Sequence, residues 1–454
     1  MRIAVVLSLL LFSSLRLYSQ SKPVPISLLE ALQQSEKNYP ALKSKSFEAD
    51  AAMKDIAISK NTLLPNVDAI YQADLATYNN ITGMTYPGSV FPITGPASAT
   101  NSYQPVFGSA ASLSFAWQPY TFGQRSAQVS TSRAGANIKV AEYQNEVFKQ
   151  KIAVTGAYLD LIFANAVLSV YRENISRVSA NLKQSRVLTT SGLRPGVDTA
   201  LFLSEYAKAN IDYLNAQKNL LSQKIILSEL VVSDAAFVAI DTFFIERLPS
   251  EKYKTTPVVH SLISLSQAKI DYSDAKEDVL KRTWYPKLTL WGTTFARGSG
   301  IHQDGSINST DGLSFSRYNY GVGLQIAFPI LKFSEARLQQ EQQNLIVKSD
   351  IEKSQQVKLQ LSKQQEIADA TLQSALSIAK ETPAQLTAAK YAFKALEVRY
   401  NTGLVNFADL MQAQYNLIKA EIDLKKSYLD VWKALLYKTA VTGDLNIFLN
   451  ELTQ

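Results

Sequence analysis

Residues whose types and spacing could support catalysis are scarce in this sequence. It contains no cysteine, so thiol nucleophiles, thiolate metal sites and disulfide bonds are all excluded. Its two histidines, His260 and His302, lie in unrelated contexts, the first in a helical stretch and the second in a loop rich in Gly, Ser and Asp. No nucleophile elbow, phosphate-binding loop or metal-ligand spacing is present. We therefore expect the protein not to be an enzyme, and we expect no catalytic residues, cofactor or metal site.

The residues with the clearest chemical context are two aspartates, each of which follows a Gly-Leu pair. They are Asp198 after Gly192-Leu193 and Asp409 after Gly403-Leu404. The two glycines are separated by the same number of residues as the two aspartates. Glycine can adopt the left-handed conformation that ends a helix, and an aspartate in the first turn of the next helix can cap it and complement its dipole. Each motif therefore predicts the turn of a helical hairpin.

The segments on both sides of each turn carry apolar residues at alternating intervals of three and four. This spacing is typical of helices that wrap around each other in a left-handed supercoil. Around the second turn these residues are Leu372, Ala375, Ala379, Leu386, Phe393 and Tyr400, then Leu410, Ala413, Leu417, Ala420 and Val431. Around the first turn they are Leu161, Ala164, Leu168, Val178 and Leu182, then Phe202, Ala209, Ala216, Leu220 and Leu227. The repetition of a whole hairpin indicates an internal duplication.

Four stretches between the helical segments alternate in polarity as strands do. They are residues 66–75, 112–118, 287–297 and 318–328. In the last, one face carries Tyr318, Tyr320, Val322, Leu324, Ile326 and Phe328, and the other carries small or polar residues. That pattern is typical of a transmembrane β-barrel strand. A strand of a soluble sandwich would look similar alone, but three further strands and a secretory signal favour the membrane.

Residues 1–19 have the features of a cleaved signal peptide. Arg2 precedes an apolar run over residues 3–12, which is too short to span a bilayer. We find no other apolar run of about 18 residues, so we expect no transmembrane helix. After the signal peptide, we expect two similar halves, residues 20–240 and 241–454, each with the element order α-β-β-α-α.

Four strands cannot close a barrel, and an open sheet edge in lipid would leave backbone groups without hydrogen-bond partners. Several copies of the chain must therefore complete it: two copies give eight strands, and three give twelve with room for a pore. The helices before the turns, of about seventy residues and roughly 100 Å, must extend from the barrel into the periplasm. We expect a bend or break at Pro383 in the second half. The predicted fold class is thus an α+β membrane protein.

The order and spacing of several short motifs resemble the TolC-like outer-membrane efflux proteins. The motifs are Ser27-Leu28-Leu29-Glu30-Ala31-Leu32 with Tyr39-Pro40, Leu63-Leu64-Pro65, Trp284-Tyr285-Pro286, Phe122-Gly123-Gln124-Arg125 and the two Gly-Leu turns. The resemblance covers nearly the whole chain after the signal peptide. It implies a homotrimer that shares one twelve-stranded barrel, with four strands per chain, and a long periplasmic coiled-coil tunnel. It also implies docking at the helix tips to a periplasmic adaptor (membrane fusion) protein and to an inner-membrane transporter of the RND or ABC class.

The resemblance also implies roles for individual residues. It places Asp409 in the ring of acidic residues that narrows the periplasmic mouth, and Gln412 at the next inward position, where some relatives carry a second acid. Asp198 matches a carboxylate that helps to latch the closed tip. The usual cationic partner of that carboxylate falls at Val405 here, and Arg194 is the candidate to replace it. The turn residues Gly192, Leu193, Gly403 and Leu404 are the expected adaptor-docking surface. Helix capping is the simpler interpretation of both aspartates and is compatible with these roles.

These features favour a passive exit duct for small molecules in the bacterial outer membrane, with its helices in the periplasm. A type I protein secretion duct is the alternative within the same class, and the tunnel sequence does not separate the two. A structural or adhesive coiled-coil surface protein is the alternative from another class, but it would need neither a polar strand face nor two matched turns. Basic residues are scattered among acids along the heptads, so we expect no nucleic acid as a partner. The barrel strands imply contact with outer-membrane lipid.

Overall fold

The computed structural model describes residues 24–77, 101–192, 195–234, 237–250, 258–302, 304 and 306–452. The chain forms two compact units. The helical unit comprises Met1–Asp50, Ile138–Ala268 and Ile351–Gln454, and the sheet unit comprises Ala51–Asn137 and Lys269–Asp350. The predicted signal peptide, residues 1–19, lies outside the described residues. The division of the rest into repeats over 20–240 and 241–454 stays a prediction.

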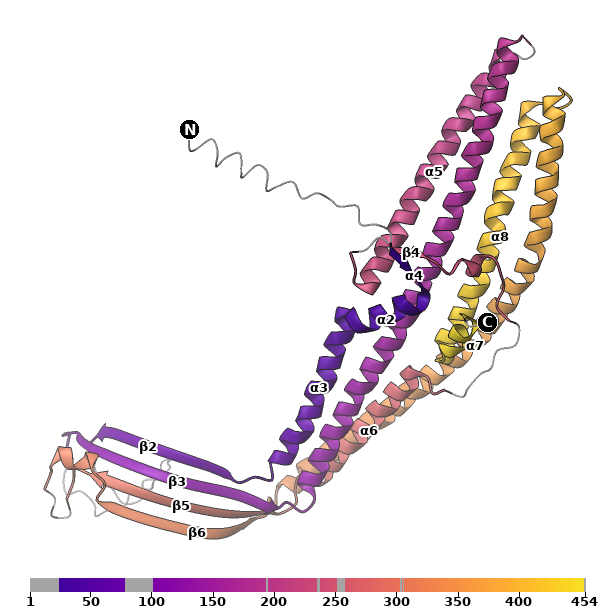
Figure 1. Ribbon diagram of the computed structural model, residues 1–454. Helices are drawn as coiled ribbons and strands as arrows, with labels where there is room; N and C mark the ends of the chain where they lie inside the picture. The colour runs from indigo at the N-terminus through magenta and orange to yellow at the C-terminus, as the bar shows by residue number, and fades with distance from the viewer. Residues whose placement is uncertain are drawn as a thin grey trace, which may run out of the picture. The chain divides into compact units, whose positions relative to one another are not determined.

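The sheet unit contains a four-stranded antiparallel sheet (Figure 1). Its strands are β2 (Asn66–Ala76), β3 (Val106–Tyr120), β5 (Lys287–Ser299) and β6 (Arg317–Ala327), in the order β2-β3-β5-β6. The four predicted strands are therefore confirmed. β2 and β6 are the outer strands, and within the described residues each has one edge without a neighbouring strand. The 3₁₀ helix η2 (Ser309–Leu313) lies in the connection between β5 and β6.

The register of the sheet gathers most of the apolar side chains on one face. Leu290 lies opposite Leu324, and Ala296 lies opposite Tyr318. The apolar residues of β6 are strongly exposed in the single chain, with Tyr320 at 89% and Leu324 at 65%. A soluble sandwich would bury such a face against a second sheet, whereas a barrel strand turns it toward lipid.

Aromatic side chains cluster at the end of the sheet where β5 begins and β6 ends. The ring of Trp284 lies 5.3 Å from that of Phe333 and 6.1 Å from that of Phe328. Nearby in β3, the indole Nε1–H of Trp117 donates to the carbonyl oxygen of Leu63 over 2.7 Å. Aromatic side chains with a polar atom are typical of the membrane–water interface of a barrel.

The helices precede and follow the strands in each half of the chain. They are α2 (Leu28–Asn38), α3 (Pro40–Asn61), α4 (Gln124–Thr190) and α5 (Gly196–Val231), then α6 (Ser261–Lys281), α7 (Lys332–Asn401) and α8 (Phe407–Thr442). The first helical stretch is divided into α2 and α3 at Tyr39, which has an extended backbone. The cause is Pro40, because proline disfavours the helical conformation of the residue before it.

α7 is one helix across Pro383, so the chain does not break there, and the alternative of a bend stays a prediction. Proline has no N–H, so the carbonyl four residues earlier, that of Ala379, loses its helical partner. The hydroxyl of Thr382 donates to that carbonyl oxygen over 3.2 Å and replaces part of the missing bond. The neighbouring side chain thus reduces the cost of proline at this position.

The predicted heptad residues form the core of the two hairpins, α4–α5 and α7–α8. Leu161, Val178, Phe202, Leu372 and Leu410 are each exposed by 3% or less. One expectation needs correction: within the described residues, α4 is long and apolar enough to cross a membrane by composition. More than half of its apolar window is buried inside the structure, so core packing explains that composition.

The helical unit also contains short elements that sequence periodicity did not reveal. They are β1 (Val24–Ile26), β4 (Phe237–Ala239), η1 (Thr242–Ile245), α9 (Asn446–Leu449) and η3 (Asn450–Leu452). β1 and β4 pair in parallel, and Tyr158 of α4 supports them. Its hydroxyl lies 2.9 Å from the carbonyl oxygen of Ile26 and 2.8 Å from the carboxylate of Asp241. The same carboxylate accepts the backbone N–H of Leu28 at the start of α2.

Candidate functional site

The second hairpin turn is built as the Gly-Leu pattern predicted. Gly403 has φ +81°, and its N–H bonds to the carbonyl oxygen of Tyr400 over 3.0 Å. The N–H of Leu404 bonds to the carbonyl oxygen of Arg399 over 2.8 Å. These two bonds and the left-handed glycine constitute a Schellman motif, which satisfies the last carbonyl groups of α7. Leu404 itself is 70% exposed at the tip.

The next helix, α8, is capped by Asn406. Its side-chain oxygen accepts the backbone N–H of Asp409 over 2.9 Å. The carboxylate of Asp409 is exposed in the first turn, so it is free of the capping role that Asn406 fills. Gln412 is also exposed, one turn further on, and donates to Asn416 over 3.1 Å. α8 therefore presents a polar strip opposite its buried seam, where Leu410 lies.

The first hairpin turn repeats the left-handed glycine. Gly192 has φ +72°, and its N–H bonds to the carbonyl oxygen of Thr189 over 3.0 Å. A Cβ atom at this position would meet no atom within 4 Å, so the backbone conformation alone accounts for the glycine. α5 then begins after Pro195 without a side-chain cap, and Asp198 lies in its first turn. Two predicted residues of this turn, Leu193 and Arg194, lie outside the described residues.

A hydrogen bond joins the tips of the two hairpins. The hydroxyl of Tyr400 donates to the Oδ2 atom of Asp198 over 2.9 Å. Tyr400 is only 5% exposed and packs edge-on against Phe202, with ring centroids 5.8 Å apart. Val405, where a cationic partner was sought, packs instead against the apolar cluster at the tip. Sequence analysis placed Tyr400 in the apolar seam but did not predict the hydrogen bond of its hydroxyl to Asp198. The heptad pattern gives no information about contacts with the other hairpin.

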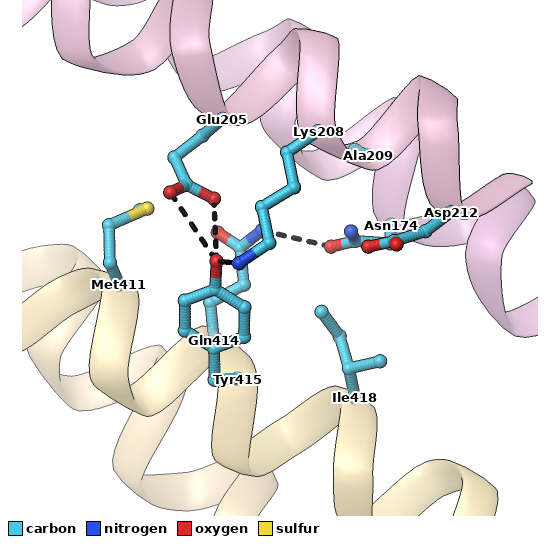
Figure 2. A pocket seen from close by; sticks show the side chains of 9 residues that line it. All are labelled: Asn174, Glu205, Lys208, Ala209, Asp212, Met411, Gln414, Tyr415 and Ile418. Carbon is cyan, nitrogen blue, oxygen red and sulfur yellow. Dashed lines mark hydrogen bonds between the residues drawn. The ribbon is translucent and has the colours of Figure 1, made fainter.

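A second polar connection between the hairpins lies further from the tip (Figure 2). Lys208 of α5 donates to the hydroxyl of Tyr415 of α8, and its ammonium group lies 4.1 Å from the centre of the Tyr415 ring. That hydroxyl also bonds to Glu205 over 3.1 Å. The hydrogen bond with Tyr415 raises the pKa of Lys208, which keeps the lysine charged. These residues carried no signal in the sequence, because charged residues beside a heptad seam are typical of solvated faces.

Amide side chains lie behind this connection. Gln414 of α8 is 3% exposed and donates to the Oδ1 atom of Asn174 of α4 over 2.9 Å. Asn174, Gln414 and Lys208 border a cavity of about 10 Å³, close to the volume that one water molecule requires. Another connection follows, in which Arg177 of α4 bonds to both carboxylate oxygens of Glu421 at 3.0 and 2.8 Å. Polar groups therefore connect the two hairpins at several levels.

Among the described residues, no cluster of His, Cys, Asp or Glu is placed to hold a metal ion.

Part of the chain matches a known protein family. Residues 262–436 match the family model described as outer membrane efflux protein. The match covers less than half of the chain, and it makes this part of the chain similar to that family. The match favours an outer-membrane efflux channel over an enzyme. No curated protein sequence matches the chain.

Solved structures of outer-membrane channels have the same fold as this chain. The outer-membrane channel OprN superposes with a TM-score of 0.70 at 15% identity, covering 92% of this chain and 89% of that one. CusC, whose structures concern folding and transmembrane channel formation, gives a TM-score of 0.74 at 12% identity over 94% and 96%. VceC from Vibrio cholerae gives 0.70 at 14% identity over 92% and 96%. The predicted TolC-like fold is thereby confirmed. Channels of this kind form trimers in tripartite pumps.

Proposed function

We propose that this chain is the outer-membrane exit duct of a tripartite pump that exports small molecules. An inner-membrane transporter of the RND or ABC class supplies the energy, and a periplasmic adaptor joins it to the duct. The sheet supports the duct, because its apolar face is exposed and both outer strands have an open edge. A structural or adhesive surface protein, the alternative from another class, has no support from the family match.

The working unit that we propose is a homotrimer. The observation that carries this proposal is the open edge on β2 and on β6, because unpaired strand edges are not stable in lipid. Pairing of these edges between three copies closes a barrel of twelve strands. The helical unit also has apolar side chains that the single chain leaves exposed. On α5 these are Leu201, Ile211, Leu214, Leu221 and Ile225, and on α7 they are Ile367, Ile378, Tyr391 and Val398.

The tips of the hairpins are the proposed gate and docking surface. Three copies of Asp409 and Gln412, carried on the exposed strip of α8, form the narrowest part of the tunnel. The bond between Asp198 and Tyr400 latches the two hairpins of each chain. The turns at Gly192-Leu193 and Gly403-Leu404 contact the adaptor. Their support is the exposed, glycine-dependent geometry of both turns.

Two measurements on the purified protein test the duct and the trimer. Native mass measurement in detergent should give three chains, and the same sample should conduct ions in planar bilayers. A protein that stays monomeric in detergent and does not conduct would contradict the proposal. Accumulation of small dyes in cells that lack the protein, with protein secretion unchanged, separates small-molecule efflux from a type I secretion duct.

A further inference from the structure

An aromatic side chain lies on the polar face of the sheet, where small residues predominate. Trp291 of β5 is opposite Ala116 of β3 and Gly323 of β6. It therefore lies on the face opposite to the exposed apolar residues of β6, such as Leu324. In the described strands it is the one tryptophan on this face, since Trp117 is opposite Leu290 and belongs to the apolar face. Its side chain is 40% exposed.

The indole of Trp291 lies flat across two glycines of the neighbouring strand. A Cβ atom at Gly323 would lie 2.6 Å from Cζ2 and 2.7 Å from Cε2 of the indole, which is closer than real atoms approach. A Cβ atom at Gly321 would lie 3.7 Å from Cζ3, an ordinary contact. One face of the ring is therefore covered by the backbone of β6, and the other is open. Gly323 is what allows the indole to lie against the sheet.

The open face of the indole favours a ligand that is flat and positively charged. The face of an indole attracts cations more strongly than that of any other side chain, and it stacks on aromatic rings. Asp68 of β2 lies on the same face of the sheet, because it is opposite Ser114, which is opposite Thr293 of β5. The carboxylate of Asp68 is exposed, but Lys287 of β5 lies on the same face as Trp291, so this wall carries charge of both signs and the indole itself provides the preference for a cation.

We propose that Trp291 is a stacking platform in the lumen of the duct that retards planar aromatic cations on their way out. The proposal rests on the proposed function, since that function makes the polar face of the sheet the wall of a pore. Three copies of the chain place three indoles at one level of the barrel. The platform selects cargo by ring stacking and cation–π attraction, with no covalent step.

Bilayer recordings with two cationic probes test this proposal. Ethidium is planar and aromatic, whereas tetraethylammonium carries the same charge without an aromatic ring. Each probe is added on the side of the bilayer where the connection between β5 and β6 lies. The concentration that halves the open-channel current is then measured. For the wild type, we expect ethidium to block the current well below the concentration at which tetraethylammonium does. Trp291→Ala should weaken ethidium block by about tenfold, as expected for one lost cation–π and stacking contact, and leave tetraethylammonium block unchanged.

Two glycine variants make a matched pair that keeps the indole in the protein. Gly323→Ala should lift the indole off the sheet and weaken ethidium block, whereas Gly321→Ala should behave as the wild type. Trp291→Phe should retain part of the block, and native mass measurement confirms the trimer for each variant. Equal ethidium block in wild type and Trp291→Ala would overturn the platform and leave the duct intact. Absence of any conductance in the wild type would overturn the duct and the platform together.

Discussion

At the scale of single residues, hydroxyl groups of buried tyrosines connect parts of the chain that are far apart in sequence. Tyr400 bonds to Asp198, and Tyr158 lies between Ile26 and Asp241. Both tyrosines belong to long helices and were indistinguishable from apolar seam residues before the fold was known. A tyrosine in a seam buries its ring and makes one directed hydrogen bond. The seam pattern predicts the burial, but the acceptor of the hydroxyl is known only from the fold.

The stability of the helical unit should depend on Tyr158 at alkaline pH. Burial, and then the hydrogen bond to the Asp241 carboxylate, raise the pKa of Tyr158 above its usual value. A raised pKa of an acid means that its contribution to stability is complete below the unfolded pKa, about 10, and is lost as pH rises beyond it. We expect the free energy of unfolding to fall above pH 10 with an added slope of up to about 1.4 kcal/mol per pH unit.

Circular dichroism during chemical unfolding between pH 8 and 11.5 measures this slope. Tyr158→Phe is the matched control, because it removes the titrating hydroxyl and keeps the ring. The variant should be less stable at pH 8 by about 1–3 kcal/mol, since the buried oxygen of Asp241 loses a partner, and its added alkaline slope should disappear. Curves for wild type and variant that stay parallel up to pH 11.5 would show that Tyr158 does not contribute.

At the scale of elements, the two Gly-Leu turns set the ends of the hairpins. Gly192→Val should strain the turn by about 1–3 kcal/mol, because a β-branched residue disfavours positive φ, although no neighbouring atom obstructs the new side chain. Gly192→Asn is the control, since asparagine tolerates the left-handed conformation. We expect cellular dye efflux to fall for valine and to persist for asparagine, with trimers intact in both. If efflux survives valine at both Gly192 and Gly403, adaptor docking lies elsewhere.

Most of the elements followed from the sequence, because their periods are physical consequences of burial. The seam residues around Gly403, such as Leu372 and Leu410, recur at intervals of three and four, and the structure buries them. The strands alternate because one face meets lipid. What stayed hidden depends on tertiary neighbours: Lys208 and Tyr415 are far apart in sequence, and the three-residue strands β1 and β4 are too short to show a period. The continuity of α7 at Pro383 was hidden as well, and there the hydroxyl of Thr382 bonds to the carbonyl oxygen of Ala379.

At the scale of the whole molecule, the two halves of the chain contribute unequal parts of the proposed gate. Residues 20–240 supply Asp198 and residues 241–454 supply Tyr400 and Asp409, so the tips are joined across the two predicted repeats. The charge of Asp409 lies on an exposed strip, whereas the Asp198–Tyr400 bond is partly buried between the hairpins. The proposed gate therefore has two parts. The ring of Asp409 carboxylates attracts cations, and the hydrogen bond between Asp198 and Tyr400 holds the two hairpins together.

Two substitutions should separate the ring from the latch in bilayer recordings. Asp409→Asn removes three negative charges around the axis and leaves the Asn406 cap in place, since that cap uses the backbone N–H of Asp409. We expect its reversal potential in asymmetric salt to show weaker cation selectivity, with conductance near that of the wild type. Tyr400→Phe removes the latch bond and keeps the ring that packs against Phe202. We expect it to raise the open probability, by about fivefold for each chain that must open, because one tip bond of about 1 kcal/mol is lost in each chain, and to leave selectivity unchanged. An unchanged reversal potential for Asp409→Asn would remove Asp409 from the gate, and an unchanged open probability for Tyr400→Phe would make its bond to Asp198 only a support of the hairpin packing.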